Sequence, residues 1–82
     1  MRIPRDLSGA DLAKALQKLG YTITRQTGSH LRLTRVAEEE HHVTIPHHRE
    51  LRVGTLSNIL ADVAEHLKKT KAELVLELWG KS

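Results

Sequence analysis

Apolar residues near the start of the chain recur at helical spacing. Ser8 and Asp11 stand at the positions of a capping box, which predicts a helix that starts at residue 9. Gly20 stands where a left-handed residue commonly ends a helix. The segment therefore reads as an amphipathic helix over residues 9–19, with one apolar face formed by Leu12, Leu16 and Leu19.

The period of the apolar residues changes to two in the next part of the chain. Residues 21–26 and 41–45 are short runs rich in strand-forming residues, and residues 30–36 alternate apolar with polar side chains. A turn at 27–29 joins the first two runs into a predicted hairpin, and Pro46 ends the third run. The pattern predicts a small antiparallel sheet of three strands.

Helical spacing returns in the second half of the chain. Thr55 is predicted to cap a helix whose apolar face is formed by Leu56, Ile59, Leu60, Val63 and Leu67. Thr70 and Glu73 form a second capping box, which favours a short third helix. The alternating leucines of residues 74–78 keep a fourth strand as the alternative.

The order of these elements predicts the fold class. One helix, three strands and a second helix indicate an α+β domain, in which helices cover one face of a three-stranded antiparallel sheet. A chain of 82 residues has room for one domain. We therefore expect a single domain over residues 1–82.

Charge is distributed unevenly along the chain. Residues 1–36 hold seven Lys and Arg against two Asp, whereas residues 37–82 hold six against eight Asp and Glu. A basic half suits a polyanion such as nucleic acid. Because Tyr21 and Trp79 are the only aromatic residues, sheets that stack several bases on aromatic side chains are excluded.

Two further functional classes are excluded or disfavoured by composition. The chain has no cysteine, which excludes disulfides, thiolate metal ligands and thiol nucleophiles. No apolar run is long enough to span a membrane, and the first residues do not resemble a secretory signal. We therefore expect a cytoplasmic protein.

A histidine at the start of the second strand is the leading candidate for chemistry. Strand alternation places His30 on the polar face with Arg32 and Thr34, away from Leu31 and Leu33. Imidazole, with a reference pKa of about 6.5, can accept or donate a proton at neutral pH.

Short motifs follow one another in an order seen in one protein family. Gly28-Ser29-His30 starts the second strand, Ile45-Pro46-His47-His48 ends the third, and Gly54-Thr55-Leu56-Ser57-Asn58-Ile59-Leu60 enters the second helix. With Ser8-Gly9 at the first helix, they resemble the HicA (YcfA-like) toxins over about residues 6–67. The resemblance implies a double-stranded-RNA-binding-domain-like αβββα fold, mRNA interferase activity and a HicB-like antitoxin partner.

The resemblance also implies which residue is catalytic. The histidine of Gly-Ser-His is catalytic in that family, which corresponds to His30. RNA supplies its own nucleophile, so a base that activates the 2′-hydroxyl and an acid that protonates the leaving 5′ oxygen suffice, without a cofactor. RNA contacts are expected from Arg25, Gly28, Ser29, Arg32 and Arg35.

The other histidines invite a metal interpretation. His41-His42 and His47-His48 are adjacent pairs. Neighbouring residues on a strand point to opposite faces, and no carboxylate stands at a familiar ligand spacing. We expect no metal site.

Two features depart from the family resemblance. Residues 38–40 form an acidic run of glutamates, and residues 68–82 extend past the matching part. The apolar residues of this extension either pack on the domain or face a partner. Two rival functions stay open: an RNA-binding module that does not cleave, and a protein-interaction domain whose basic face docks an acidic partner.

Overall fold

The computed structural model describes residues 3–37 and 39–80. Its elements are α1 (Gly9–Gln17), β1 (Thr22–Gln26), β2 (His30–Val36), β3 (Glu40–Pro46), α2 (Val53–His66) and α3 (Lys71–Trp79). The predicted αβββα order and the additional C-terminal helix are confirmed. No helix in the described ranges is long and apolar enough to cross a membrane.

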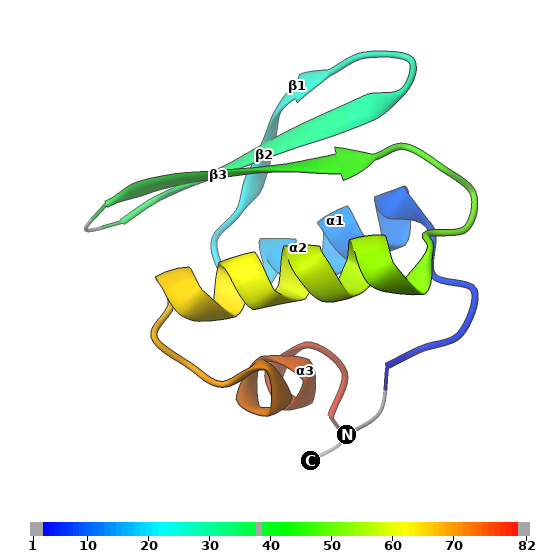
Figure 1. Cartoon of the computed structure of the whole chain (residues 1–82). Helices are drawn as coiled ribbons and strands as arrows, with labels where there is room; N and C mark the ends of the chain where they lie inside the picture. Colours follow the sequence, from blue (N-terminus) through cyan, green and yellow to red (C-terminus); the bar gives the residue numbers. More distant parts are fainter. Residues whose placement is uncertain (1–2, 38, 81–82) are drawn as a thin grey trace.

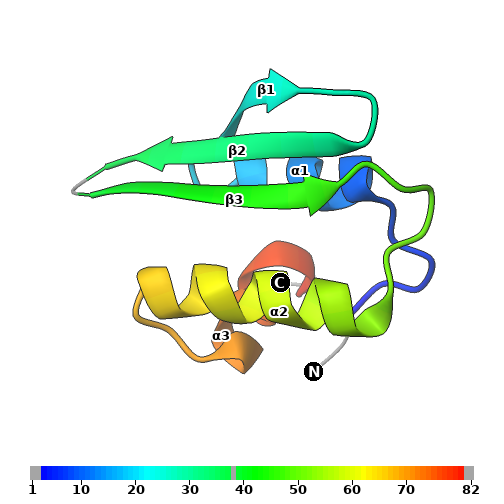
Figure 2. The ribbon, with the colours of Figure 1, turned by 45° about the horizontal axis from the view of Figure 1, so that its top comes forward.

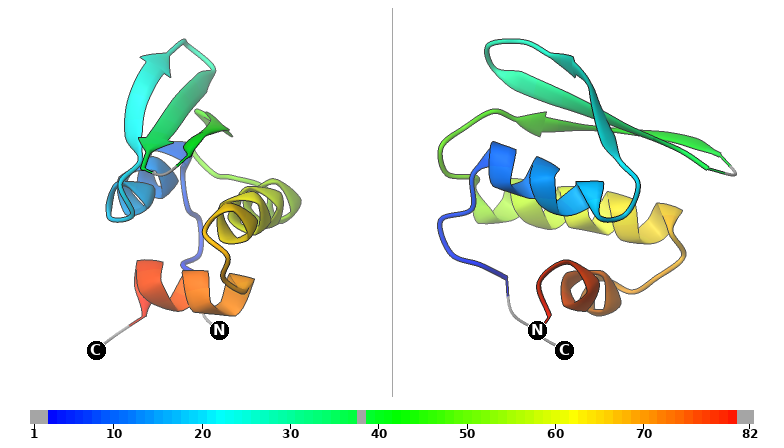
Figure 3. Two further views of the ribbon diagram at one scale, coloured as in Figure 1. Left: turned by 90° about the vertical axis from the view of Figure 1, so that its left-hand side faces the viewer. Right: turned by 180° about the vertical axis from the view of Figure 1, so that it is seen from behind.

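The elements form three layers. The antiparallel sheet has the strand order β1-β2-β3, with β2 in the centre. Helices α1 and α2 lie under one face of this sheet, and α3 lies beneath them (Figures 1 and 3). Within the described residues no element covers the other face (Figure 2), which is called the outer face below.

The core lies between the sheet and the first two helices. The inner face of the sheet is formed by four buried residues of β2 and β3: Leu31, Leu33, Val43 and Ile45. Residues of α1 and α2 pack in the same core, with Leu12, Leu16, Leu60 and Val63 fully buried. This apolar layer gives the sheet an inside and an outside, and so sets which way His30 faces.

Helix α3 completes the core from below. Leu74, Val75 and Leu78 are buried in it, whereas Leu76 is 67% exposed. The predicted third helix is therefore correct, and the alternative of a fourth strand is wrong. Leu74, Val75 and Leu78 of the C-terminal extension therefore pack on the domain, which answers for these residues the question that the sequence left open.

Both predicted capping boxes are present. Ser8 Oγ accepts a hydrogen bond from Asp11 N at 2.9 Å, and Thr70 Oγ1 accepts one from Glu73 N at 3.0 Å. Gly20 has the expected left-handed conformation, with φ of 95°, although α1 itself ends at Gln17.

Two helix boundaries differ from the prediction. Helix α1 ends at Gln17 because residues 18–20 tighten into a turn, in which Leu19 N bonds Leu16 O and Gly20 N bonds Gln17 O. Helix α2 begins earlier than predicted. Its N-cap is Arg52, which makes no side-chain capping bond, so the expected cap at residue 55 is wrong.

The early start of α2 follows from the anchoring of the preceding residue. Leu51 is buried, and its N–H donates to Leu7 O at 2.8 Å. The first helical bond then runs from Leu56 N to Arg52 O at 2.9 Å. The chain thus enters the helix directly after its buried anchor.

Candidate functional site

His30 and Arg32 lie on the outer face of the sheet. Their side chains are exposed, whereas Leu31 and Leu33 between and beside them are buried against the helices. The predicted alternation of exposed polar and buried apolar residues is confirmed over residues 30–33, whereas Thr34 is buried.

Arg25 joins this face through an irregularity in β1. The register shifts between Ile23 and Arg25, after which Arg25 stands opposite Arg32. Thr24 Oγ1 lies 2.9 Å from Thr34 Oγ1, so Thr24 also reaches the outer face. The extra residue therefore brings Arg25 to the side of Arg32, since directly opposite residues of paired strands share a face.

The structure does not bring Arg35 to His30. Arg35 lies on the inner side of β2, where its Nε donates to Leu19 O at 2.7 Å at the end of α1. Arg35 follows His30 by five positions, and residues of a strand that are an odd number of positions apart point to opposite faces of the sheet. The predicted grouping of Arg35 with His30 does not hold, and the outer-face arginines are Arg25 and Arg32.

The turn before His30 is closed by Thr27. Thr27 N donates to His30 O at 2.9 Å, and Thr27 Oγ1 accepts from His30 N at 3.0 Å and from Ser29 N at 3.3 Å. Ser29 Oγ lies 3.0 Å from His30 Nδ1. The Gly-Ser-His motif therefore forms a hydrogen-bonded turn, with the imidazole held by its neighbour.

Backbone contacts join this turn to two other motifs. His47 N donates to Ser29 O at 2.8 Å, and Gly9 N donates to His48 O at 2.9 Å. A Cβ placed on Gly9 would stand 2.1 Å from Pro46 O, so only glycine fits at the start of α1. Segments that are distant in sequence thus meet at the end of the sheet that carries His30.

The acidic run lies at the opposite end of the sheet. Glu39 and Glu40 are exposed at the β2–β3 turn, and Glu38 lies outside the described residues. The length of β2 separates this turn from His30 by roughly 20 Å, at ~3.3 Å per residue. Figure 2 shows the two turns at opposite ends of the sheet. The acidic residues therefore stand away from the outer-face arginines.

His41 takes part in a structural network that the sequence did not reveal. On the inner side, Tyr21 Oη lies 2.6 Å from His41 Nδ1, and His41 Nε2 lies 3.3 Å from Asp62 Oδ1. The ring of His41 stacks on His66 with centroids 4.1 Å apart. No motif marks these residues, because they come together only when β3 packs against α2.

Burial favours the protonated form of the Tyr21 hydroxyl. Burial raises the pKa of Tyr21 to about 12, while Arg35 lowers it and Asp62 raises it by smaller amounts. Asp62 Oδ1 can only accept, so a neutral His41 ring with its proton on Nε2 would donate to Asp62 and accept the Tyr21 hydroxyl proton at Nδ1.

His42 lies on the other face from His41, as the alternation predicted. Its Nδ1 lies 2.8 Å from Thr34 Oγ1, and its Nε2 lies 2.9 Å from Glu40 Oε2. Across residues 3–37 and 39–80, no three His, Asp or Glu side chains come close enough to hold a metal ion.

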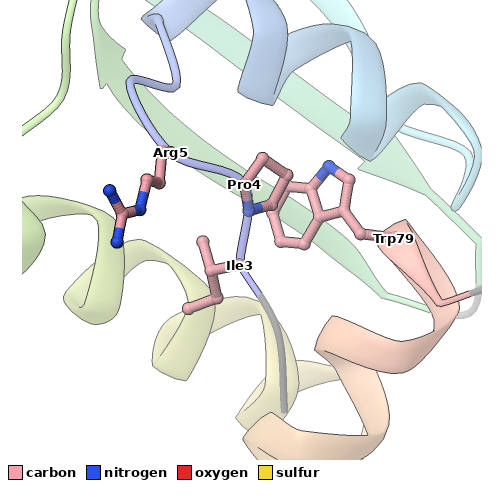
Figure 4. A pocket seen from close by; sticks show the side chains of 4 residues that line it. All are labelled: Ile3, Pro4, Arg5 and Trp79. Atoms are coloured by element: carbon pink, nitrogen blue, oxygen red, sulfur yellow. The ribbon is translucent and has the colours of Figure 1, made fainter.

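A pocket of about 520 Å³ lies away from the sheet. Figure 4 shows the residues that line it, which are Ile3, Pro4, Arg5 and Trp79. None of the predicted site residues is among them. His30 stands instead on an exposed sheet face, which suits an extended polymer better than an enclosed small molecule.

Comparison with known proteins bears on what this face does. A family model described as the HicA toxin of bacterial toxin-antitoxin systems matches residues 9–65, more than half of the chain. The chain belongs to the HicA toxin family. The matched region runs from the start of α1 almost to the end of α2, so α3 lies outside it. No curated protein and no solved structure matches the chain.

Proposed function

We propose that this HicA-family toxin is an endoribonuclease that cleaves mRNA in the cytoplasm and is neutralised by a HicB-like antitoxin. The observation that carries the proposal is the outer face, where His30 is exposed beside Arg32 and Arg25 in a chain of a toxin family. A phosphodiester needs both a proton-transfer group and cations, and this face offers them together.

The proposed reaction is an internal transesterification. His30 accepts the proton of a 2′-hydroxyl, whose oxygen attacks the adjacent phosphorus. The bond from phosphorus to the 5′ oxygen breaks, and that oxygen takes up a proton, so the products are a 2′,3′-cyclic phosphate and a 5′-hydroxyl. No metal is required, because the substrate carries its own nucleophile and imidazole can transfer protons in both directions.

The surroundings of His30 support this chemistry. Arg32 and Arg25 place positive charge where the phosphorane develops negative charge. A Cβ placed on Gly28 would meet nothing within 4 Å, so the fold itself does not require a glycine there. The space beside Gly28 therefore remains free for a phosphate to approach the backbone.

The test of the function is the substitution His30→Ala. We expect the variant to fold like the parent, since exposed substitutions usually change stability by less than about 0.5 kcal/mol. Its rate of mRNA cleavage should fall by roughly two to four orders of magnitude, the usual contribution of a general acid or base. Its RNA affinity should fall far less, because Arg25 and Arg32 remain.

The comparison of parent and variant distinguishes the possible functions. Cleavage by purified His30→Ala at the parental rate would remove His30 from the mechanism. A parent that binds RNA without cutting it would identify an RNA-binding module instead, and a parent that binds no RNA at low salt would indicate a protein-interaction domain.

The proposed antitoxin interface is the same outer face. Covering an exposed active site is the simplest way to silence it, and acidic groups of a partner would pair with Arg25 and Arg32. Hydrogen exchange on the free and complexed toxin should show new protection in β2 and β3. Protection confined to α3 and the solvent side of α2 would contradict this placement.

A further inference from the structure

His30 has one engaged and one free ring nitrogen. Its Nδ1 lies 3.0 Å from Ser29 Oγ. Among the contacts of the described residues, Nε2 has no protein partner. The free nitrogen belongs to an exposed ring on the outer face, so a substrate can reach it.

The backbone of both residues is fixed, although both side chains are exposed. Ser29 donates through its N–H to Thr27 Oγ1 at 3.3 Å and accepts at its carbonyl from His47 N at 2.8 Å. His30 donates through its N–H to Thr27 Oγ1 at 3.0 Å and accepts at its carbonyl from Thr27 N at 2.9 Å. All four backbone polar groups of the pair are therefore bonded, which preorganises the Ser29 hydroxyl next to the ring.

We propose that Ser29 is a positioning residue that selects the reactive tautomer of His30, an inference that rests on the proposed ribonuclease function. A neutral imidazole carries one N–H, and the hydrogen bond at one nitrogen decides which nitrogen carries it. A free histidine side chain favours the Nε2–H form, which cannot accept a proton at Nε2. The Ser29 hydroxyl can donate to a bare Nδ1 or accept from Nδ1–H. In the proposed arrangement Oγ accepts from Nδ1–H, which leaves on Nε2 the lone pair that the reaction needs.

With the Nδ1–H tautomer, His30 can transfer every proton that the reaction moves. Nε2 takes the proton of the 2′-hydroxyl, and the resulting imidazolium keeps its Nδ1–H on Ser29 Oγ. Nε2–H then gives its proton to the leaving 5′ oxygen, which returns His30 to its starting tautomer. The Ser29 hydroxyl keeps its own proton throughout and serves only as an acceptor.

The geometry also separates this role from direct RNA contact. A serine that served the substrate would direct its hydroxyl to the open face, whereas Ser29 Oγ lies within hydrogen-bond distance of the neighbouring ring. The turn itself depends on Thr27 Oγ1 and on main-chain atoms, not on the Ser29 side chain. The variant Ser29→Ala should therefore keep the turn and lose only the contact with Nδ1.

The decisive measurement is the ¹⁵N chemical shifts of the His30 ring, in protein with labelled histidine. A His30→Gln spectrum assigns the signals. We expect mainly the Nδ1–H form in the parent and in Ser29→Thr, and a shift toward the Nε2–H form in Ser29→Ala. The cleavage rate at saturating RNA should fall about three- to tenfold in Ser29→Ala, the equivalent of one hydrogen bond, with KM unchanged and recovery in Ser29→Thr.

A control on the same face is Thr44→Ala. Thr44 is exposed and stands opposite Arg32, with no contact to His30 among those the structure describes, so its loss should change neither the tautomer nor the rate. An unchanged tautomer in Ser29→Ala would overturn the role of Ser29, whatever the rate. If Ser29→Ala shifts the tautomer but the parent does not cleave RNA, the role of the Ser29 contact is retained and the ribonuclease proposal is overturned instead.

Discussion

At the scale of single residues, the side chain of Tyr21 combines full burial with a polar contact. It lies directly before β1, and its hydroxyl contacts His41 of β3, which in turn contacts Asp62 of α2. A buried hydroxyl without a partner would destabilise the fold, so the bond to His41 Nδ1 satisfies it. The neutral phenol is the form that this environment accepts, and this has a measurable consequence at high pH.

The protein should lose stability between about pH 10 and about pH 12. The pKa of Tyr21 is raised to about 12 by burial, against about 10 in the unfolded chain. Because folding favours the protonated phenol, this stabilisation is complete below about pH 10 and is lost as the pH rises toward 12. Tyr21 is the only tyrosine, so its ultraviolet absorbance reports its ionisation directly.

The control for this prediction is Tyr21→Phe. The variant should be less stable at neutral pH by about 1 kcal/mol, because it loses the bond to His41. Its urea midpoint should also fall less steeply between about pH 10 and about pH 12 than that of the parent. Ionisation of the folded parent near pH 10 would contradict the effect of burial.

Residue parity explains which parts of the site the sequence could predict. His30 and Arg32 differ by two positions and share a face, and this was read correctly. Arg35 was grouped with His30, although the same rule puts residues five positions apart on opposite faces, and the structure shows Arg35 bonded to Leu19 O. Arg25 could not be placed by parity, because the irregularity after Ile23 shifts the register of β1. The contact of Tyr21 with His41 depends on packing, which no local pattern encodes.

At the scale of elements, the contact of α1 with the end of β3 joins the motifs of the site. Gly9 opens α1, and its N–H bonds His48 O while its Cα faces Pro46 O. The same end of β3 is bonded to the turn before His30 through His47 and Ser29. Displacing α1 from β3 should therefore disturb the site as well as the core.

The substitution Gly9→Ala should destabilise the protein by about 1–3 kcal/mol. Its new Cβ would stand 2.1 Å from Pro46 O, which is backbone and cannot turn away. The matched control is Gly54→Ala in α2, where a Cβ meets nothing within 4 Å and alanine favours the helix by up to about 1 kcal/mol. Urea unfolding of the two variants measures the difference, and equal stability would show that α1 can shift without cost.

Element types were predicted well because each segment agrees with its own local signals. The capping boxes of α1 and α3 and the alternation in β2 are all present in the structure. The start of α2 was missed because no side chain caps it. That boundary is set by the buried Leu51 and its bond to Leu7 O, which is a tertiary contact.

At the scale of the whole molecule, the basic residues Arg25 and Arg32 lie on the face of the sheet that no helix covers. The basic half of the sequence supplies Arg25 and Arg32 to the outer face, while the acidic turn lies at the far end of the sheet. The helices cover the inner face and hold the core. One end of the outer face is therefore basic, and this is the end that would attract a polyanion.

RNA binding should fall steeply with salt, and Arg32 should account for part of the dependence. For single strands the log–log slope changes by about 0.7 for each phosphate neutralised. In a His30→Ala background, in which cleavage is expected to be slow, Arg32→Glu should weaken binding and flatten this slope by about that amount. The matched control is Lys14→Glu, which makes the same charge change on the exposed side of α1. Titrations of a labelled RNA at several salt concentrations would compare them; equal losses in the two variants would show that net charge matters, and not the outer face.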